Sequence, residues 1–245
     1  MEQIQLLALQ NFPLIEPGDH LDSIIFDSIL KNHIDICDGD VFIIAQKIIS
    51  KAEDRYLNLS SLNLSSKAVS LSKKMNRDPY FIQAVINESN EIVSIGKNVI
   101  IVEHKLGFIN INAGIDKSNI SQEINQVLLL PENPSKSADL IQKKLSQKLE
   151  KNISVVITDS MTRPYRSGIT NFALASANLQ SLIDLTGDKD IYGNLLKNTE
   201  IAIADEIAAA SGLLMGQGSD MQPVILLKGF NKDKYAINNA IDLIV

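Results

Sequence analysis

The sequence predicts a fold of mixed α and β structure, because two kinds of hydrophobic pattern alternate along the chain. Residues 153–157 are an apolar and mostly β-branched run, which is typical of a buried strand. Residues 40–45 form a second short apolar run of this kind. Residues 21–30 and 137–149 instead carry apolar side chains close to helical spacing. We therefore expect strands and helices in one fold.

Composition bounds the class of protein. The chain has 245 residues, enough for one large domain or two interleaved ones. Its net charge of −6 argues against general nucleic-acid binding. The single cysteine, Cys37, excludes an internal disulfide, and its apolar neighbours predict a buried, passive thiol. Without a signal-peptide pattern or a membrane-spanning run, we expect a cytoplasmic protein with no membrane partner.

In the first half of the chain, turn residues and caps separate the expected elements. Asp78 and Pro79 are a good helix start, with a carboxylate at the N-cap and proline at the first helical position. Gly96, Lys97 and Asn98 read as the turn of a hairpin. We expect a strand at residues 3–9, a loop at 13–18, a helix at 21–30 and a strand at 40–45. A loop passing into a helix at 55–76, a second helix at 78–86, a hairpin at 91–102 and a strand at 107–112 are expected to follow.

In the second half, Ser137 is expected to cap a helix whose apolar face is Ile141, Leu145 and Leu149. The pattern of residues 171–184 does not decide between helix and strand. After the strand at 153–160, we expect a polar loop at 186–193, a strand at 199–204, a helix with many small residues at 205–215 and a closing strand at 223–229.

The strand at 153–160 is expected to end in Thr158, Asp159 and Ser160, with Arg163 and Arg166 in the following turn. A carboxylate beside a hydroxyl suits a hard divalent cation, and paired guanidinium groups suit phosphate or carboxylate. The alternative is a strand that runs into a polar turn, with Asp159 capping the next element.

Two further strands are also followed by polar groups. Gln46, Lys47, Ser50 and Lys51 follow the strand at 40–45, where lysines could meet a phosphate or simply lie in solvent. After the strand at 107–112, the chain passes through Asp116 and Asn119, for which an Asx-type turn is the alternative interpretation.

Several common catalytic motifs are absent from the sequence. It has no phosphate-binding P-loop, no dinucleotide fingerprint, no nucleophile elbow and no zinc-protease motif. Its three histidines, His20, His33 and His104, are scattered. A Ser-His-Asp hydrolase or a zinc enzyme is therefore not expected, and an oxygen-rich metal site built from several strand ends remains.

Segments over nearly the full length together resemble the coenzyme F420 γ-glutamyl ligase family. They are residues 12–18, 48–53, 112–119, 158–168, 190–193 and 204–218. The resemblance implies an α+β fold with mixed sheets and flanking helices, without a classical P-loop, that forms an intertwined homodimer. It also implies one ligase unit over residues 1–245, or two interleaved subdomains.

The resemblance implies an activity as well. Members of the family use GTP and two Mn²⁺ or Mg²⁺ ions, aided by K⁺, to join L-glutamate to the deazaflavin precursor coenzyme F420-0. GTP would phosphorylate the terminal carboxylate of the acceptor, and the glutamate amine would then displace phosphate to form an amide. Such chemistry needs alignment and charge neutralisation more than a protein nucleophile.

Site residues follow by position from the resemblance. Asp116 and Asp159 would bind the first metal, and Ser160 and Gln217 the second. Asp159, Arg163 and Arg166 would be catalytic, with the arginines holding the phosphate or carboxylate of the acceptor. The implied GTP contacts are Leu14, Ile15, Glu16, Gln46, Lys47, Lys51, Asn119, Met215, Gly216, Gln217, Gly218, Ser219, Asp220, Met221 and Gln222.

The chain departs from the family pattern at three places. Ser160 stands where threonine is frequent, and Gln217 stands where some members have glutamate, so the second metal should bind more weakly. Met161 and Thr162 replace a glycine-bearing segment, which would reshape the acceptor pocket. One alternative is therefore the same chemistry on another acceptor, such as a folate-like pterin. Another is a non-catalytic nucleotide-binding module, which the clustered charges argue against.

Overall fold

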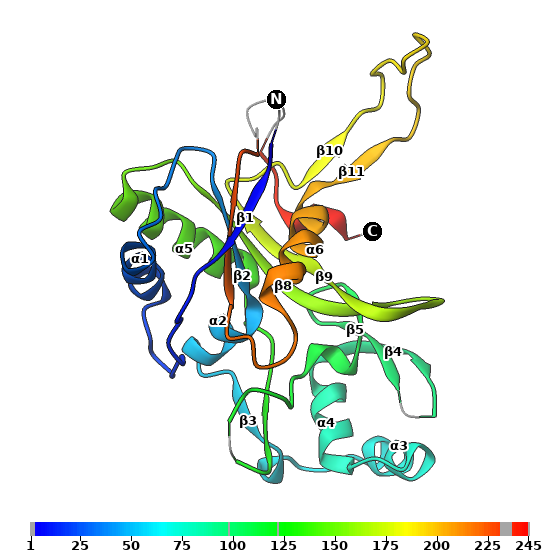
Figure 1. Cartoon of the computed structure of the whole chain (residues 1–245). Coiled ribbons are helices and arrows are strands. Elements are labelled where there is room, and N and C mark those ends of the chain that lie inside the picture. The colour runs from blue at the N-terminus through cyan, green and yellow to red at the C-terminus, as the bar shows by residue number, and fades with distance from the viewer. Residues whose placement is uncertain (1–2, 98, 122, 231–236, 245) are drawn as a thin grey trace.

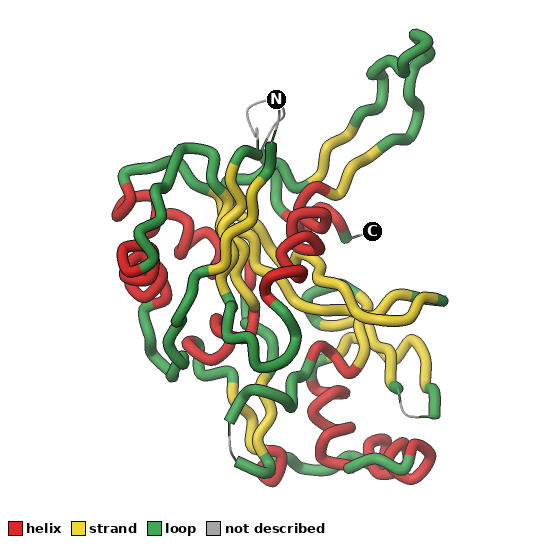
Figure 2. Tube along the Cα trace, viewed as in Figure 1, coloured by secondary structure: helices red, strands yellow, loops and turns green. Residues whose placement is uncertain are grey.

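The computed structural model describes residues 3–97, 99–121, 123–230 and 237–244. It is an α+β fold built on a five-stranded mixed sheet with helices on both faces (Figures 1 and 2). The strand order is β1-β12-β2-β8-β9. Only β2 and β8 run parallel to each other, and the other neighbours in this sheet are antiparallel.

The described residues contain six α-helices, which are α1 (Leu21–Lys31), α2 (Gln46–Ala52), α3 (Ser66–Met75), α4 (Pro79–Asn87), α5 (Pro134–Leu149) and α6 (Ile203–Met215). The strands are β1 (Gln5–Ala8), β2 (Val41–Ala45), β3 (Tyr56–Asn58), β4 (Ser89–Ile95), β5 (Ile100–His104), β6 (Ile109–Ile111), β7 (Gln126–Leu128), β8 (Ser154–Arg163), β9 (Arg166–Ala177), β10 (Leu182–Asp184), β11 (Glu200–Ala202) and β12 (Val224–Lys228). Short 3-10 helices cover Leu59–Ser61, Asn112–Gly114 and Ala240–Leu243. No described helix has the length and apolar character needed to cross a membrane.

The central strands are apolar on both sides because both faces of the sheet are covered. On one face, Phe42 and Val155 lie in a core with Ile25 of α1 and Ile141 of α5. Alternate residues of the same strands, such as Ile43, point to the other face, where α6 packs. Burial on both faces explains why β2 and β8 read as continuous apolar runs in the sequence.

A separate apolar cluster lies between β2 and β8 in the sequence. It is built from α3, α4 and the sheet β4-β5-β6, with Phe81, Ile82, Val85, Ile100 and Val102 fully or almost fully buried. The antiparallel pair β3 and β7 contributes Leu57 and Val127 to it. The division of the chain into one unit or two interleaved subdomains stays a prediction.

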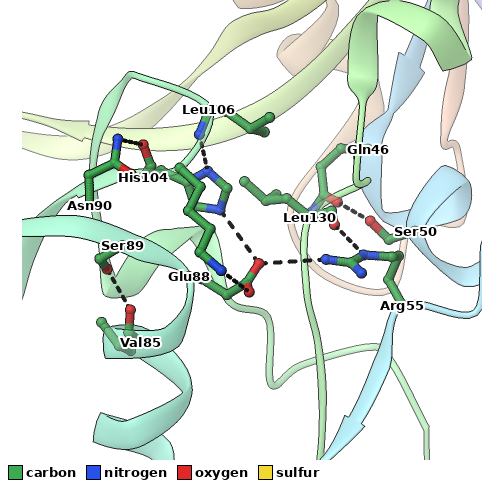
Figure 3. A network of polar contacts seen from close by, with 11 residues as sticks. Gln46, Ser50, Arg55, Val85, Glu88, Ser89, Asn90, His104, Leu106 and Leu130 are labelled. Carbon is green, nitrogen blue, oxygen red and sulfur yellow. Dashed lines mark hydrogen bonds and ion pairs between the residues drawn. The ribbon is translucent and has the colours of Figure 1, made fainter.

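A network around Glu88 joins this cluster to the neighbouring strands (Figure 3). The Arg55 Nε donates to the Leu130 carbonyl at 2.9 Å, and its Nη2 lies 3.5 Å from Glu88 Oε2. Lys105 Nζ is 3.6 Å from the other Glu88 oxygen. His104 lies beside Glu88, with its Nε2 4.0 Å from Glu88 Oε2 and its Nδ1 accepting from the Leu106 amide. Burial lowers the pKa of His104 to about 4, so its imidazole is neutral at pH 7.

Most of the expected elements are present. The helix expected at 78–86 begins as predicted, since Asp78 caps it through the Tyr80 amide and Pro79 is its first residue. The hairpin strands and the strands near both chain ends are also confirmed. Asn98 of the expected hairpin turn lies outside the described residues.

Four expectations were wrong or incomplete. The strand at 153–160 continues to Arg163, because it forms a long hairpin with β9. The cap of α5 is Asn133 and not Ser137, since Asn133 accepts from the Lys136 amide and is followed by a proline. The loop expected after residue 55 contains β3, which pairs with β7. Cys37 is exposed, because it lies in the loop before β2.

Candidate active site

The parallel pair β2 and β8 brings the first two groups of polar residues together. Ala45 pairs with Thr158, so the residues that follow each of them, Gln46 and Asp159, meet at one edge of the sheet. Helix α2 begins directly at Gln46, which also places Lys47 and Lys51 at this edge. Two segments more than one hundred residues apart therefore build one site.

The third segment arrives through a strained turn. Asn112, Ala113 and Gly114 all have left-handed backbone conformations, with φ of 52°, 55° and 63°. Such a run is unfavourable for residues other than glycine and persists only where its surroundings impose it. The Arg77 Nη1 donates to Asn112 Oδ1 at 2.8 Å. The turn leads into Asp116, whose backbone pairs with Leu128 in both directions, at 2.9 and 3.0 Å.

Asp116 and Asp159 share this edge, and both are partly buried. The Gln46 Nε2 donates to Asp116 Oδ2 at 2.7 Å, and Lys47 Nζ lies 3.3 Å from Asp116 Oδ1. Burial raises the pKa of Asp116 against the opposing effects of Lys47 and Gln46. Burial, and then the charge of Asp116, raise the pKa of Asp159 to about 7. The pair thus carries more negative charge than the protein around it compensates.

A cavity of about 1190 Å³ opens over this pair. That exceeds the roughly 300–1,000 Å³ typical of small-molecule sites, so it has room for a nucleotide. Its lining residues that can carry charge near pH 7 are five acids and two lysines: Glu16, Asp54, Asp116, Glu123, Asp159, Lys47 and Lys51. A polyphosphate could enter such an acidic cavity only together with added cations.

The loop after α6 forms another wall of the cavity. Gly218 accepts, through its carbonyl, a hydrogen bond of 2.9 Å from Asn119 Nδ2. The Gln217 Nε2 donates to Asn171 Oδ1 at 3.1 Å, so the amide oxygen of Gln217 faces away from this contact. Asp220 holds the turn by accepting from the Gly218 amide at 3.2 Å.

The structure gathers most of the residues implied by the resemblance. All four implied metal ligands line the cavity, and so do all the implied GTP contacts except Asp220. Ile15 lines it, although its side chain belongs to the core. Arg163 and Arg166 are not among the lining residues, because they face each other at the tip of the β8–β9 hairpin. There Arg163 donates to the Ser167 carbonyl at 3.3 Å.

Asn171 is a site residue that sequence reasoning missed. It is 5% exposed, lines the cavity and orients Gln217. Its position opposite Ser160 depends on the β8–β9 pairing, and residues 171–184 carried no clear pattern. Tyr56 and Ser118 also line the cavity and were not predicted. Ser118 lies within the segment 112–119 that carries the resemblance. No local motif marks Asn171 or Tyr56, and only the pairing of the strands could have indicated Asn171.

A smaller cavity of about 160 Å³ reaches Asp116 and Asp159 as well. Its other walls come from β6, the strained turn and the residue after it, and the β8–β9 hairpin; they are Asn110, Ile111, Gly114, Ile115, Ser160, Met161, Thr162 and Ile169. The two carboxylates therefore border both the large and the small cavity.

The donor set fits a hard divalent cation. Two carboxylates, a hydroxyl and an amide oxygen are the oxygen ligands that Mg²⁺ and Mn²⁺ prefer. The excess negative charge of the Asp116–Asp159 pair points the same way. Among the described residues, histidine, cysteine and acidic side chains nowhere gather in threes, so a cation here would have two carboxylates and need Ser160 and Gln217 to complete its ligands.

Comparison with known proteins agrees with the resemblance found in the sequence. The family model "F420-0:Gamma-glutamyl ligase" matches residues 10–229. The coenzyme F420:L-glutamate ligase of Methanothermobacter thermautotrophicus is 34% identical, over 93% of this chain and 89% of the relative. The protein of the same name from Methanocaldococcus jannaschii is 36% identical, over 94% of this chain and 89% of the relative. The one from a Methanococcus maripaludis strain is 40% identical, over 78% of this chain and 76% of the relative. The chain therefore belongs to the F420-0:γ-glutamyl ligase family.

Proposed function

We propose that the protein is a GTP-dependent ligase that joins L-glutamate to the terminal carboxylate of coenzyme F420-0. The observation that carries the proposal is the Asp116–Asp159 pair, which lacks sufficient compensating charge and lies under a cavity large enough for a nucleotide. A site of this kind suits phosphoryl transfer, in which cations and alignment do most of the work. The names of the relatives supply coenzyme F420 and L-glutamate, the family description supplies F420-0, and GTP is implied by the resemblance.

In this proposal the nucleotide occupies the large cavity. Lys47 is the second residue of α2 and Lys51 lies one turn later in the same helix; both line the cavity and would meet the phosphates. The loop at 216–219 and the Asn119 side chain that holds it would close over the base or ribose. The terminal phosphate would then lie toward the acidic floor of the cavity.

Asp116 and Asp159 would hold one divalent ion, and Ser160 with the free amide oxygen of Gln217 would contribute to a second. These ions, with K⁺, would neutralise the transferring phosphate and align it with the acceptor. Gln217 is uncharged, so its contribution to binding is smaller than that of a carboxylate. Asn171 would keep the Gln217 oxygen turned toward the ion by occupying the amide nitrogen.

The acceptor carboxylate would approach through the small cavity. It borders the same two carboxylates and includes Met161 and Thr162, where the chain departs from the family pattern. A bond would form between an oxygen of the acceptor carboxylate and the terminal phosphorus of GTP, while the bond from that phosphorus to the departing GDP breaks. The glutamate nitrogen then bonds to the acyl carbon, phosphate leaves, and a proton is lost from the amine.

The proposal includes a homodimer. The arm formed by β10, β11 and the loop between them projects from the body of the protein (Figure 1). Its tip exposes Ile191, Tyr192 and Leu195, at 91%, 84% and 60% of their surface. Apolar side chains in such a position are more readily explained by a protein partner than by solvent. Sedimentation velocity of the wild-type protein and of a Tyr192→Ser variant tests this part.

Mass spectrometry of the reaction mixture tests the function. The protein is incubated with GTP, Mn²⁺, L-glutamate and either F420-0 or a pterin with a terminal carboxylate. The proposal predicts a gain of one or more glutamyl masses on F420-0 that requires both GTP and metal. A gain on the pterin alone would contradict the proposed acceptor and retain the chemistry. Nucleotide binding with no product on either acceptor would indicate a non-catalytic module.

A further inference from the structure

Gln46 is buried at the floor of the large cavity, and both ends of its side-chain amide have partners in the protein. The residue is 2% exposed, and Ser50, one turn further along α2, is fully buried. The Ser50 hydroxyl donates to Gln46 Oε1 at 2.9 Å, and Gln46 Nε2 donates to Asp116 Oδ2 at 2.7 Å. Hydrogen bonds therefore run from Ser50 to Gln46 and from Gln46 to Asp116, and we call this chain the Ser50–Gln46–Asp116 relay.

The chemistry of the partners fixes the orientation of the amide. An ionised carboxylate can only accept hydrogen bonds, so the nitrogen of Gln46 must face Asp116. The oxygen then faces Ser50, whose hydroxyl can rotate to donate. Turning the amide over would set two oxygen atoms against each other at the carboxylate. The relay therefore has one satisfied arrangement.

This arrangement distinguishes the two oxygen atoms of Asp116. Oδ2 is held by the amide, whereas Oδ1 faces the Lys47 ammonium at 3.3 Å. Lys47 has another partner, the Ser118 carbonyl at 3.1 Å, and its side chain is 26% exposed, so it can move away. An amide is also a neutral donor, which orients the carboxylate without cancelling its charge.

We propose that Gln46, held by Ser50, is a positioning residue that presents Oδ1 of Asp116 to a divalent cation, and that its side chain does not bind the nucleotide. The cation takes the place that the Lys47 ammonium occupies beside Oδ1, and the lysine becomes available to the phosphates. This inference rests on the proposed function for the identity of the ligands. It assigns Gln46 a different role from the GTP contact implied by the resemblance.

The first test is Mn²⁺ binding to the nucleotide-free protein, measured from the electron paramagnetic resonance signal of free Mn²⁺. Gln46→Met keeps the length of the side chain and removes both hydrogen bonds, so the Kd should rise about 10–100-fold. Ser50→Ala removes only the outer hydrogen bond and should raise the Kd by a few-fold. Thermal unfolding of each variant checks that it is folded, and Ser50→Ala carries the test if Gln46→Met does not fold.

Two buried residues outside the site supply matched controls. Gln83 in α4 is 6% exposed and has amide partners in Ser65 and Asn87. Ser211 in α6 is fully buried and donates to the Ala208 carbonyl. Gln83→Met and Ser211→Ala lose comparable hydrogen bonds, and their Mn²⁺ affinity should stay within about twofold of wild type.

Steady-state kinetics separates the two roles of Gln46. A positioning role predicts a higher Mn²⁺ concentration for half-maximal rate in Gln46→Met, with the KM for GTP unchanged at saturating Mn²⁺. An unchanged Mn²⁺ Kd with a raised KM for GTP would overturn the inference and restore a nucleotide contact. A wild-type protein that binds no Mn²⁺ would also overturn it. Mn²⁺ binding that depends on Gln46 in a protein that makes no glutamyl product would remove the proposed function and leave the positioning role intact.

Discussion

Two acidic sites of this protein differ in how their charge is compensated. Asp22 in α1 is 7% exposed, and its carboxylate lies 2.7 Å from Lys148 Nζ and 3.4 Å from Lys144 Nζ of α5. Burial alone would raise the pKa of Asp22, but the hydrogen bonds and charges of the two lysines outweigh it and lower the pKa. At the cavity floor, burial and mutual repulsion raise the pKa of Asp159 to about 7.

The difference separates a structural carboxylate from a functional one. The lysines around Asp22 join two helices, and the ion pairs are complete without any ligand. Asp116 and Asp159 have one close ammonium group between them, from Lys47, and both border the cavities. Incomplete compensation costs stability in the empty protein, and it creates affinity for a divalent cation.

The largest expected effect is on catalysis. Asp159→Asn removes a metal-binding charge, and we expect ligase activity to fall by roughly 10³-fold or more. Above pH 7 the metal-free variant should be more stable than metal-free wild type, because the uncompensated charge of Asp159 is lost. Product formation by mass spectrometry and urea denaturation measure the two quantities. Activity close to wild type would contradict the metal assignment.

Lys47→Met tests the one cation that touches the pair. Removing it takes away a partner of Asp116 and a positive charge facing the nucleotide, so the KM for GTP should rise about 10-fold or more. Calorimetric titration of GTP in the presence of Mn²⁺ checks the affinity directly. An unchanged GTP affinity would show that Lys47 serves Asp116 alone.

Stability of the metal-free protein should depend on pH through Asp159. Its pKa is about 7 in the folded protein and 3.8 when unperturbed, so the folded state holds the proton more tightly. This contribution is present in full below pH 3.8 and is lost as the pH rises toward 7. Between pH 5 and 7.5 we expect wild type to lose on the order of 2–3 kcal/mol relative to Asp159→Asn. The lowered pKa of His104 also makes stability depend on pH, but this contribution is the same in both proteins and cancels when their stabilities are subtracted.

The same pH titration can be repeated with Mn²⁺ in excess. The cation binds the ionised form of Asp159, so its stabilising effect should grow as the pH rises through 7. Urea denaturation with EDTA and with Mn²⁺ at each pH gives both curves. A wild-type protein whose stability follows that of Asp159→Asn at every pH would contradict the raised pKa.

Asp22→Asn should have the opposite profile from Asp159→Asn. It leaves Lys144 and Lys148 without their carboxylate, and we expect a loss of about 1–3 kcal/mol in the free energy of unfolding. Because the pKa of Asp22 is lowered, this stability is present above the unperturbed pKa of 3.8 and disappears at lower pH. Ligase activity measured below the unfolding temperature should stay within about twofold of wild type. A large loss of activity would erase the distinction between the two sites.

Much of the fold was predictable because local signals are strong where packing is regular. The apolar runs of β2 and β8 and the proline-marked start of α4 identified these elements correctly. The same capping logic applies to Asn133 and Pro134, where the prediction was placed too late in the chain. The extension of β8 was not visible, since all residues from Thr158 to Arg163 except Met161 are polar and become a strand only by pairing with β9.

The site was predictable in its members and less so in their contacts. The expectation that several strand ends contribute to one site is supported by Gln46, Asp116 and Asp159, which lie together. Arg163 and Arg166 do not line the cavity, because the long hairpin carries them to its tip. Asn171 and the Ser50–Gln46–Asp116 relay depend on tertiary contacts that no local pattern encodes.

The most direct test of the account is the affinity of Mn²⁺ for wild type, Asp159→Asn and Asp22→Asn at pH 7.5, measured without nucleotide. We predict that wild type and Asp22→Asn bind the ion with similar Kd, whereas Asp159→Asn binds it at least 10-fold more weakly. Equal affinity of all three proteins would contradict the claim that the uncompensated carboxylates at the cavity floor are the cation site.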